Sequence, residues 1–121
     1  MSGEEQDRLY ALTERLRAFV RERDWEQFHS PKNLAMAMIV EAAELVEHFQ
    51  WMTEQQSSER LPEKREQVAQ EISDTFIYLL RMADVLGIDL IAAAHAKMDL
   101  NALKYPADKV RGSNAKYTEY Q

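Results

Sequence analysis

Glu41 and Glu44 lie in the middle of residues 34–51, a stretch that is largely apolar (LAMAMIVEAAELVEHFQW). The composition of this stretch predicts a helix that is apolar around most of its circumference. Glu41 and Glu44 are three residues apart and therefore share one face of that helix. Glu71 and Asp74 repeat the spacing inside a second apolar run. Carboxylates in such surroundings are costly to desolvate and repel one another, so we expect them to be protonated or neutralised by a cation.

The residue types near both pairs favour a hard divalent cation over iron or zinc. The chain has no cysteine, and its single Glu-x-x-His, Glu26 to His29, falls in a presumed loop. Di-iron carboxylate bundles use Glu-x-x-His motifs on their helices, whereas oxygen-only ligation favours Mg²⁺, with Mn²⁺ as a substitute. Mg²⁺ usually shares its coordination sphere with substrate phosphates, which points toward nucleotide chemistry. Spacing alone leaves a structural role for the carboxylates open.

Composition places the chain among ordinary globular proteins. Its 121 residues, 45% hydrophobic and 30% charged, predict a single domain over residues 1–121. The net charge of −6 argues against a general nucleic-acid or anionic-membrane surface. The N-terminal residues resemble no secretory signal, and no apolar run is long enough to span a bilayer, so we expect a cytoplasmic protein.

Hydrophobic periodicity and few glycines and prolines predict an all-α fold, a four-helix bundle with an irregular C-terminal tail. The expected helices cover residues of about 4–23, 31–54, 62–86 and 89–103. Ser30 before Pro31 is a plausible N-cap, and Gly87 is a natural helix stop. Residues 24–30 and 53–61 read as loops, residues 106–121 as irregular, and residues 116–120 are aromatic enough to dock on the body or a partner. The second and third helices are apolar on more than one face, which predicts a subunit interface.

Further side chains are candidates for the site. Glu47 follows Glu44 by three residues, so it could be a further ligand or a base, although an ordinary exposed Glu explains it equally well. Aromatic residues of small helical proteins are mostly core, yet Trp25 lies in a loop and Trp51 near the end of the acidic helix, where rings can stack on a base. The remaining candidates for substrate contacts are His29, Tyr78, Lys97, Asn101, Lys104 and Tyr105, for several of which an amphipathic surface is the plainer explanation.

Several motifs resemble the dCTP pyrophosphatase branch of the MazG-like all-α nucleoside triphosphate pyrophosphatases. They are RDWEQFHSPKNL from Arg23, EAAELVEHFQW from Glu41, EISDTFIYL from Glu71, KMDLNALKYP from Lys97 and KYTE from Lys116. The paired E-x-x-E and E-x-x-D motifs mark the superfamily, whereas WEQFH and KMDxNxxxYP are narrower and point to the branch. Together they cover nearly the whole chain.

The resemblance implies hydrolysis of a nucleoside triphosphate to the monophosphate and pyrophosphate, with dCTP or modified dCTP as substrate, in nucleotide-pool sanitation. It implies Mg²⁺ held by Glu41, Glu44, Glu71 and Asp74. It also implies a base pocket at Trp25 and Trp51, sugar and triphosphate contacts from Tyr78, Lys97, Asn101 and Tyr105, and dimers or tetramers of four-helix units. Relatives in the branch can carry a His in the first helix that reaches the base, where this chain has Leu16 or its neighbours.

The expected mechanism is attack of water at the α-phosphorus with pyrophosphate leaving, and Glu44 or Glu47 accepting the proton. Two alternatives remain open. One is a related enzyme that acts on dUTP or on an oxidised, halogenated or other non-canonical nucleotide. The other is a non-enzymatic helical interaction module in which the carboxylates only set the register of the helices.

Overall fold

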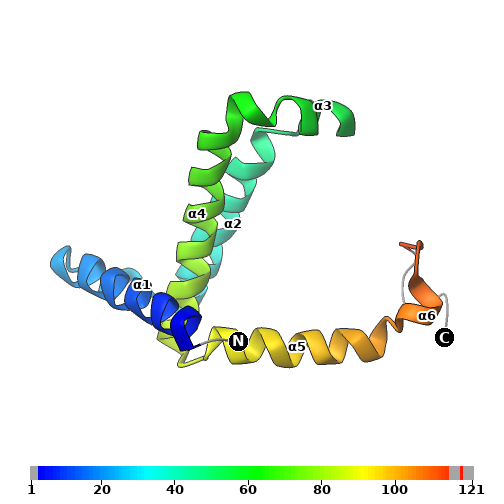
Figure 1. Cartoon of the computed structure of the whole chain (residues 1–121). Coiled ribbons are helices and arrows are strands. Elements are labelled where there is room, and N and C mark those ends of the chain that lie inside the picture. Colours follow the sequence, from blue (N-terminus) through cyan, green and yellow to red (C-terminus); the bar gives the residue numbers. More distant parts are fainter. Residues whose placement is uncertain (1–2, 115–117, 119–121) are drawn as a thin grey trace. The chain divides into compact units, whose positions relative to one another are not determined.

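The computed structural model describes residues 3–114 and 118, and for residues 5–7 the backbone only. Every regular element in this part of the chain is helical, so the all-α prediction is confirmed. Contacts divide the chain into a first unit, Met1–Ile88, and a second unit, Asp89–Gln121. The elements are α1 (Gly3–Glu22), η1 (Glu26–Phe28), α2 (Pro31–Glu47), α3 (Glu54–Glu59), α4 (Leu61–Leu86), α5 (Leu90–Lys104) and α6 (Ala107–Val110). Figure 1 labels the α-helices.

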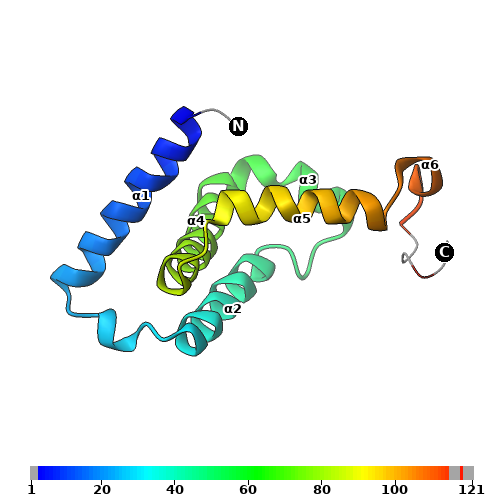
Figure 2. The same ribbon diagram turned by 90° about the horizontal axis from the view of Figure 1, so that it is seen from below.

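The first unit is built on α2 and α4, which lie side by side and run in opposite directions (Figures 1 and 2). Helix α2 begins as expected, because Ser30 Oγ accepts a hydrogen bond of 3.2 Å from Asn33 N–H and Pro31 occupies the first turn. Helix α4 ends at Gly87, whose φ of +68° is left-handed and costs glycine little. The antiparallel pairing brings the middle of α2 against the middle of α4, where the acidic pairs lie.

Two expected boundaries after α2 were wrong. The helix ends at Glu47 and not near residue 54, because Phe49 N–H donates to Val46 O and tightens the chain into a turn. The expected loop at 53–61 contains α3, which a capping box starts. Thr53 Oγ1 accepts from Gln56 N–H, and the Gln56 side chain accepts from Thr53 N–H.

The buried core is small. Among the described residues, its buried side chains come from α1, α2 and α4: Val20, Leu34, Val68, Leu80 and Ala83. Large apolar side chains of α2 and α4 remain exposed, among them Met36, Ile39, Val40, Val46, Ile72, Phe76 and Leu79. No helix among the described residues combines the length and the apolar character needed to cross a bilayer.

The second unit consists of α5 and α6. Helix α5 matches its expected bounds within one residue, and the Asp89 carboxylate caps it by accepting from Ala92 N–H at 3.0 Å. The short helix α6 corrects the expectation of an irregular tail from residue 106, because residues 109–111 donate i→i−3 and i→i−4 bonds to residues 106 and 107. Of the segment expected to dock, residues 116, 117, 119 and 120 lie outside the described part.

Candidate metal and nucleotide site

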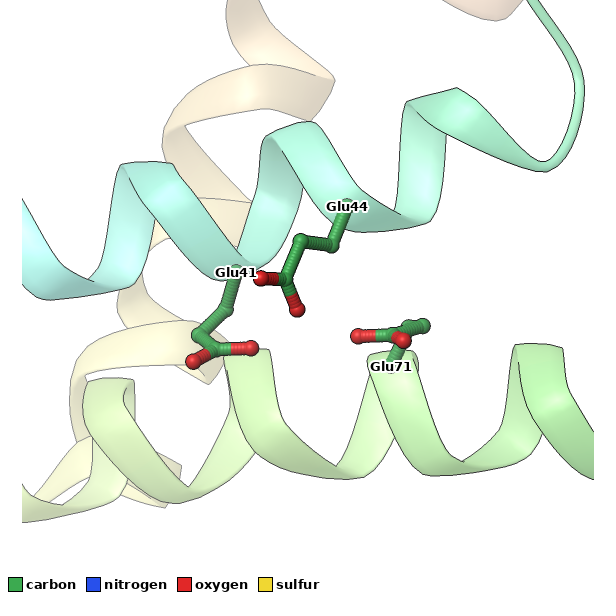
Figure 3. A group of neighbouring side chains, drawn as sticks. All are labelled: Glu41, Glu44 and Glu71. Carbon is green, nitrogen blue, oxygen red and sulfur yellow. The ribbon is translucent and has the colours of Figure 1, made fainter.

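Three of the four predicted carboxylates meet between α2 and α4. Glu41 and Glu44 extend from α2, and Glu71 extends from α4 toward them (Figure 3). One carboxylate oxygen of each lies within 4.8 Å of those of the other two, and all three side chains are half-buried. Their helix spacing and the antiparallel pairing produce this convergence, so the site follows directly from local sequence and one packing contact.

The three carboxylates are electrostatically unfavourable as they stand. The pKa of Glu41 is raised, first by partial burial and then by the hydrogen bond and negative charge of Glu44. The pKa of Glu71 is raised by partial burial and then by the charge of Glu44. One Glu71 oxygen, Oε2, is buried and lacks a hydrogen-bond partner within the described part of the chain. A cation would relieve both the repulsion and the unsatisfied acceptor.

His48 is a neighbour of the site that sequence reasoning did not assign. Its Nε2 lies 3.8 Å from Glu71 Oε1, and the positive charge it can carry opposes the rise in the pKa of Glu71. The signal was available, because His48 follows Glu41 by seven residues and Glu44 by four and therefore shares their face of the helix.

Asp74 and Glu47 lie apart from this trio. Asp74 is exposed on α4, although its charge contributes to the raised pKa of Glu41 and of Glu71. Glu47 is exposed and is the last residue of α2. The structure therefore brings together three of the four predicted metal ligands and leaves Asp74 and Glu47 outside the cluster.

The aromatic candidates are accessible. Trp25 is 44% exposed and packs edge-on against Phe19, with ring centroids 5.8 Å apart. The Arg23 guanidinium lies over the Phe19 ring, 3.6 Å from its centroid. Trp51 is 89% exposed in the turn after α2. Tyr78 is half-buried on α4, four residues after Asp74.

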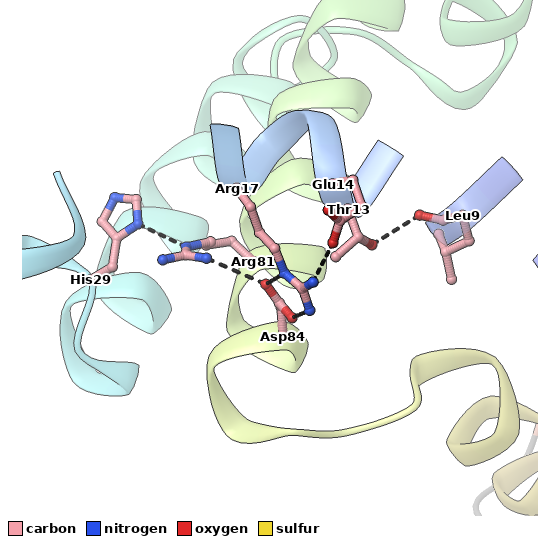
Figure 4. A network of polar contacts seen from close by, with 7 residues as sticks. All are labelled: Leu9, Thr13, Glu14, Arg17, His29, Arg81 and Asp84. Atoms are coloured by element: carbon pink, nitrogen blue, oxygen red, sulfur yellow. Dashed lines mark hydrogen bonds and ion pairs between the residues drawn. The ribbon is translucent and has the colours of Figure 1, made fainter. Parts of the chain in front are cut away.

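A polar network that the sequence did not predict holds His29. Arg81 Nε donates to His29 Nδ1 at 3.1 Å, and Arg81 Nη1 donates to Asp84 Oδ2 at 3.4 Å (Figure 4). Asp84 also accepts two hydrogen bonds from Arg17 of α1. Burial and then the Arg81 charge lower the pKa of His29, so its neutral form is favoured. The network joins α1, the segment after η1 and α4.

The remaining candidates for substrate contacts belong to the second unit: Lys97, Asn101, Lys104 and Tyr105. Lys97 and Asn101 lie four residues apart on one side of α5, the former exposed and the latter half-buried. Tyr105 N–H donates to Asn101 O at 2.7 Å, and Lys104 Nζ lies 5.6 Å from the Tyr105 ring centroid. These contacts place three of the four side chains at the C-terminal end of α5.

Known proteins resemble both the sequence and the fold. The MazG-like family matches residues 36–120. Human (Homo sapiens) dCTP pyrophosphatase 1 is 45% identical over 103 residues, which cover 84% of this chain and 61% of that protein. The protein of the same name from Bos taurus is 44% identical over the same extent. The chain therefore spans about three-fifths of the length of these curated relatives.

The resemblance extends to three dimensions. The crystal structure of a pyrophosphatase from Archaeoglobus fulgidus aligns with a TM-score of 0.80 at 41% sequence identity, covering 82% of this chain and 93% of that one. The resemblance to the dCTP pyrophosphatase branch that the sequence motifs indicated is thus confirmed.

Proposed function

The chain belongs to the MazG-like family, and from that premise we propose that it hydrolyses a nucleoside triphosphate, dCTP or a modified dCTP, to the monophosphate and pyrophosphate. The single observation that carries the proposal is the convergence of Glu41, Glu44 and Glu71. A triphosphate substrate needs a cation to offset its charge, and this trio needs one as well. The curated relatives are named dCTP pyrophosphatases, which supports a cytosine nucleotide as the substrate.

The donor set fits Mg²⁺, with Mn²⁺ as a substitute. Every candidate ligand is a carboxylate oxygen, the donor type that hard divalent cations prefer, and Glu71 Oε2 is a buried acceptor without a partner among the described residues. Glu41, Glu44 and Glu71 would hold the ion, and Asp74 would complete the set from the next turn of α4. When bound, such an ion offsets phosphate charge and makes a water molecule easier to deprotonate.

The residues of the chain would then bind and orient the substrate. In the reaction a water oxygen bonds to the α-phosphorus, the bond from that phosphorus to pyrophosphate breaks, and a carboxylate accepts the proton of the water. Glu44 or Glu47 is the proposed acceptor. The exposed rings of Trp25 and Trp51 would stack on the base. The other proposed contacts, to base, sugar and phosphates, are His29, Tyr78, Lys97, Asn101, Lys104 and Tyr105.

We also propose a homo-oligomer, a dimer or a tetramer of four-helix units. The exposed apolar side chains on α2 and α4, such as Ile39, Val40 and Phe76, support it, since leaving so many in water is unfavourable. Size-exclusion chromatography with light scattering measures the assembly, and a monomer at micromolar concentration would contradict it.

Pyrophosphate release tests the activity directly. A panel of dCTP, halogenated and oxidised dCTP, dUTP and the ordinary triphosphates, each with Mg²⁺, should give the highest kcat/KM for a cytosine nucleotide. Glu41→Gln should remove nearly all turnover and keep the helical circular dichroism. Full activity in that variant would contradict the proposed metal ligation.

The half-buried Leu16 of α1 favours keeping a second substrate in the panel. Relatives can carry a His in this helix that reaches the base, and Leu16 cannot make that contact. The alternative substrate is therefore dUTP or another non-canonical nucleotide. A non-enzymatic interaction module remains the other alternative, and it predicts no thermal shift with Mg²⁺ plus nucleotide.

A further inference from the structure

The segment between α1 and α2, residues 24–30, carries Trp25 and His29 and is fixed at both ends. At its start, Trp25 N–H donates to Val20 O and Asp24 N–H to Arg21 O, the two bonds of a Schellman motif. At its end, Ser30 caps α2, and Asn33 Nδ2 donates to Phe28 O at 3.0 Å. We call residues 24–30 the aromatic segment. These contacts are local in sequence and do not tie it to α4.

Arg81 supplies the tie to α4. Its Nε donates to His29 Nδ1 at 3.1 Å, across 52 residues of sequence. The Arg81 side chain is only 11% exposed, and Asp84, at 14%, accepts from its Nη1. Asp84 is in turn held by Arg17, so the guanidinium of Arg81 is oriented by a carboxylate that is itself oriented (Figure 4).

Arg81, which holds His29 by a hydrogen bond, lies on the same side of α4 as two of the candidate metal ligands. Glu71, Asp74, Tyr78 and Arg81 recur at steps of three, four and three residues and so form one stripe of the helix. Asp74 and Arg81 are separated by about 10 Å of helix axis. That span is comparable to the reach from the phosphates of a nucleotide to its base. The stripe thus runs from the carboxylates to the aromatic segment.

We propose that Arg81 is a positioning residue for the nucleotide base: acting through His29, and held by Asp84 and Arg17, it fixes the aromatic segment against α4. The inference rests on the proposed function. Because a guanidinium only donates, His29 Nδ1 must accept, and the neutral imidazole therefore carries its proton on Nε2. The Nε2–H and the Trp25 ring are thereby presented in one orientation.

The tautomer gives a test that is independent of activity. In ¹⁵N-labelled protein near neutral pH, long-range ¹H–¹⁵N spectra should show His29 as the Nε2–H tautomer, and Arg81→Met should shift it toward a mixture. The methionine fills similar volume without donors. Wild-type His29 protonated on Nδ1 would overturn the inference whether or not the protein is an enzyme.

Kinetics separate positioning from a merely structural role. Arg81→Met should raise KM for the best nucleotide about tenfold, the loss expected for one charged hydrogen bond, with kcat within about twofold of wild type. The Mg²⁺-induced rise in Tm, measured without nucleotide, should not change. The matched control is Arg65→Met, on the exposed side of the same helix, which should leave KM unchanged.

A double-mutant cycle shows whether Arg81 acts through His29. The His29→Ala and Arg81→Met effects on KM should not add, so the double variant should resemble the worse single one. Additive effects, or equal losses in kcat and in Mg²⁺ stabilisation, would overturn the inference. Should Arg81→Met fail to fold, Arg81→Lys keeps the charge without the fork and should raise KM in the same way. Absence of pyrophosphate release from wild type would instead refute the proposed function.

Discussion

Arg17 of α1 and Asp84 of α4, 67 residues apart in sequence, form a bidentate ion pair. Arg17 Nε donates to Asp84 Oδ2 at 2.8 Å, and Arg17 Nη2 donates to Oδ1 (Figure 4). The hydrogen bonds from Arg17 are the main reason that the pKa of Asp84 is lowered. Among the described residues, α1 contributes only Val20 to the buried core, and this pair adds a charged contact between α1 and α4.

Replacing Asp84 should therefore destabilise the protein. Asp84→Asn leaves Arg17 and Arg81 facing each other without an anion, and we expect a loss of about 1.5–3 kcal/mol in unfolding free energy, toward the lower end because Arg17 is partly exposed. Urea denaturation measures it. Glu22→Gln, on the exposed side of α1, is the control and should change little.

The pH dependence of this effect has a definite sign. Since the folded pKa of Asp84 lies below its ordinary value, its stabilisation is complete above that value and disappears as the pH falls through the folded pKa. The difference between wild type and Asp84→Asn should thus shrink between about pH 5 and about pH 2. A difference that stays constant over this range would contradict the charge argument.

The three clustered carboxylates should destabilise the folded protein when no metal is bound. Because the pKa of Glu71 is raised, the folded protein binds its proton more tightly than the unfolded chain, and stability without metal should fall as the pH rises above about 4.5. Glu71→Gln should have a higher Tm than wild type without metal near about pH 8, by a few degrees at most.

Added Mg²⁺ should reverse the order. It should raise the Tm of wild type, by linkage, and leave that of Glu71→Gln nearly unchanged. The exposed Glu63 of α4 is the matched control, and Glu63→Gln should respond to Mg²⁺ as wild type does. An equal Mg²⁺ response in all three proteins would exclude Glu71 as a ligand.

Much of the fold and the core of the site could be predicted because their signals are local. Ser30 before Pro31, Gly87, and the three-residue spacing of Glu41 and Glu44 each act within one or two helical turns. The end of α2 could not be predicted in the same way, because residues 48–52 contain no glycine or proline to stop a helix. Thr53 and Gln56 did carry a capping-box signal, which the polarity of the segment obscured.

The network around Asp84 was beyond sequence reasoning for a different reason. Arg17, Arg81 and Asp84 are residue types that usually lie in solvent. Arg81 and Asp84 are three residues apart, but Arg17 lies 67 residues from Asp84, and His29 lies 52 residues from Arg81. Only the packing of α1 and the aromatic segment on α4 shows that they are paired. Long-range polar contacts of this kind have no period in the sequence.

Asp24 should tolerate glycine better than any β-branched residue. Its φ of +53° is left-handed, at the C′ position of the Schellman motif that ends α1. Asp24→Gly relieves the steric cost and loses the 3.2 Å hydrogen bond from Gln27 Nε2 to Asp24 Oδ2, so it should be close to neutral. Asp24→Val should be less stable than Asp24→Gly by about 1–2 kcal/mol. Equal Tm values would show that the turn rearranges.

Trp51 should matter for substrate and not for folding. Because its side chain is 89% exposed, Trp51→Ala should leave the Tm within about 1 °C of wild type. Stacking on a base contributes about 1–3 kcal/mol, so KM for the best nucleotide should rise by about tenfold or more. Tyr10→Ala is the control, because it also removes an exposed ring, but one that lies on α1, and it should not change KM. The enzyme should also discriminate less between bases, so the ratio of kcat/KM for cytosine and uracil nucleotides should move toward one. If Trp51→Ala instead lowered kcat and kept KM, the ring would act on the reacting phosphate end, and the assignment of Trp51 to the base would be wrong.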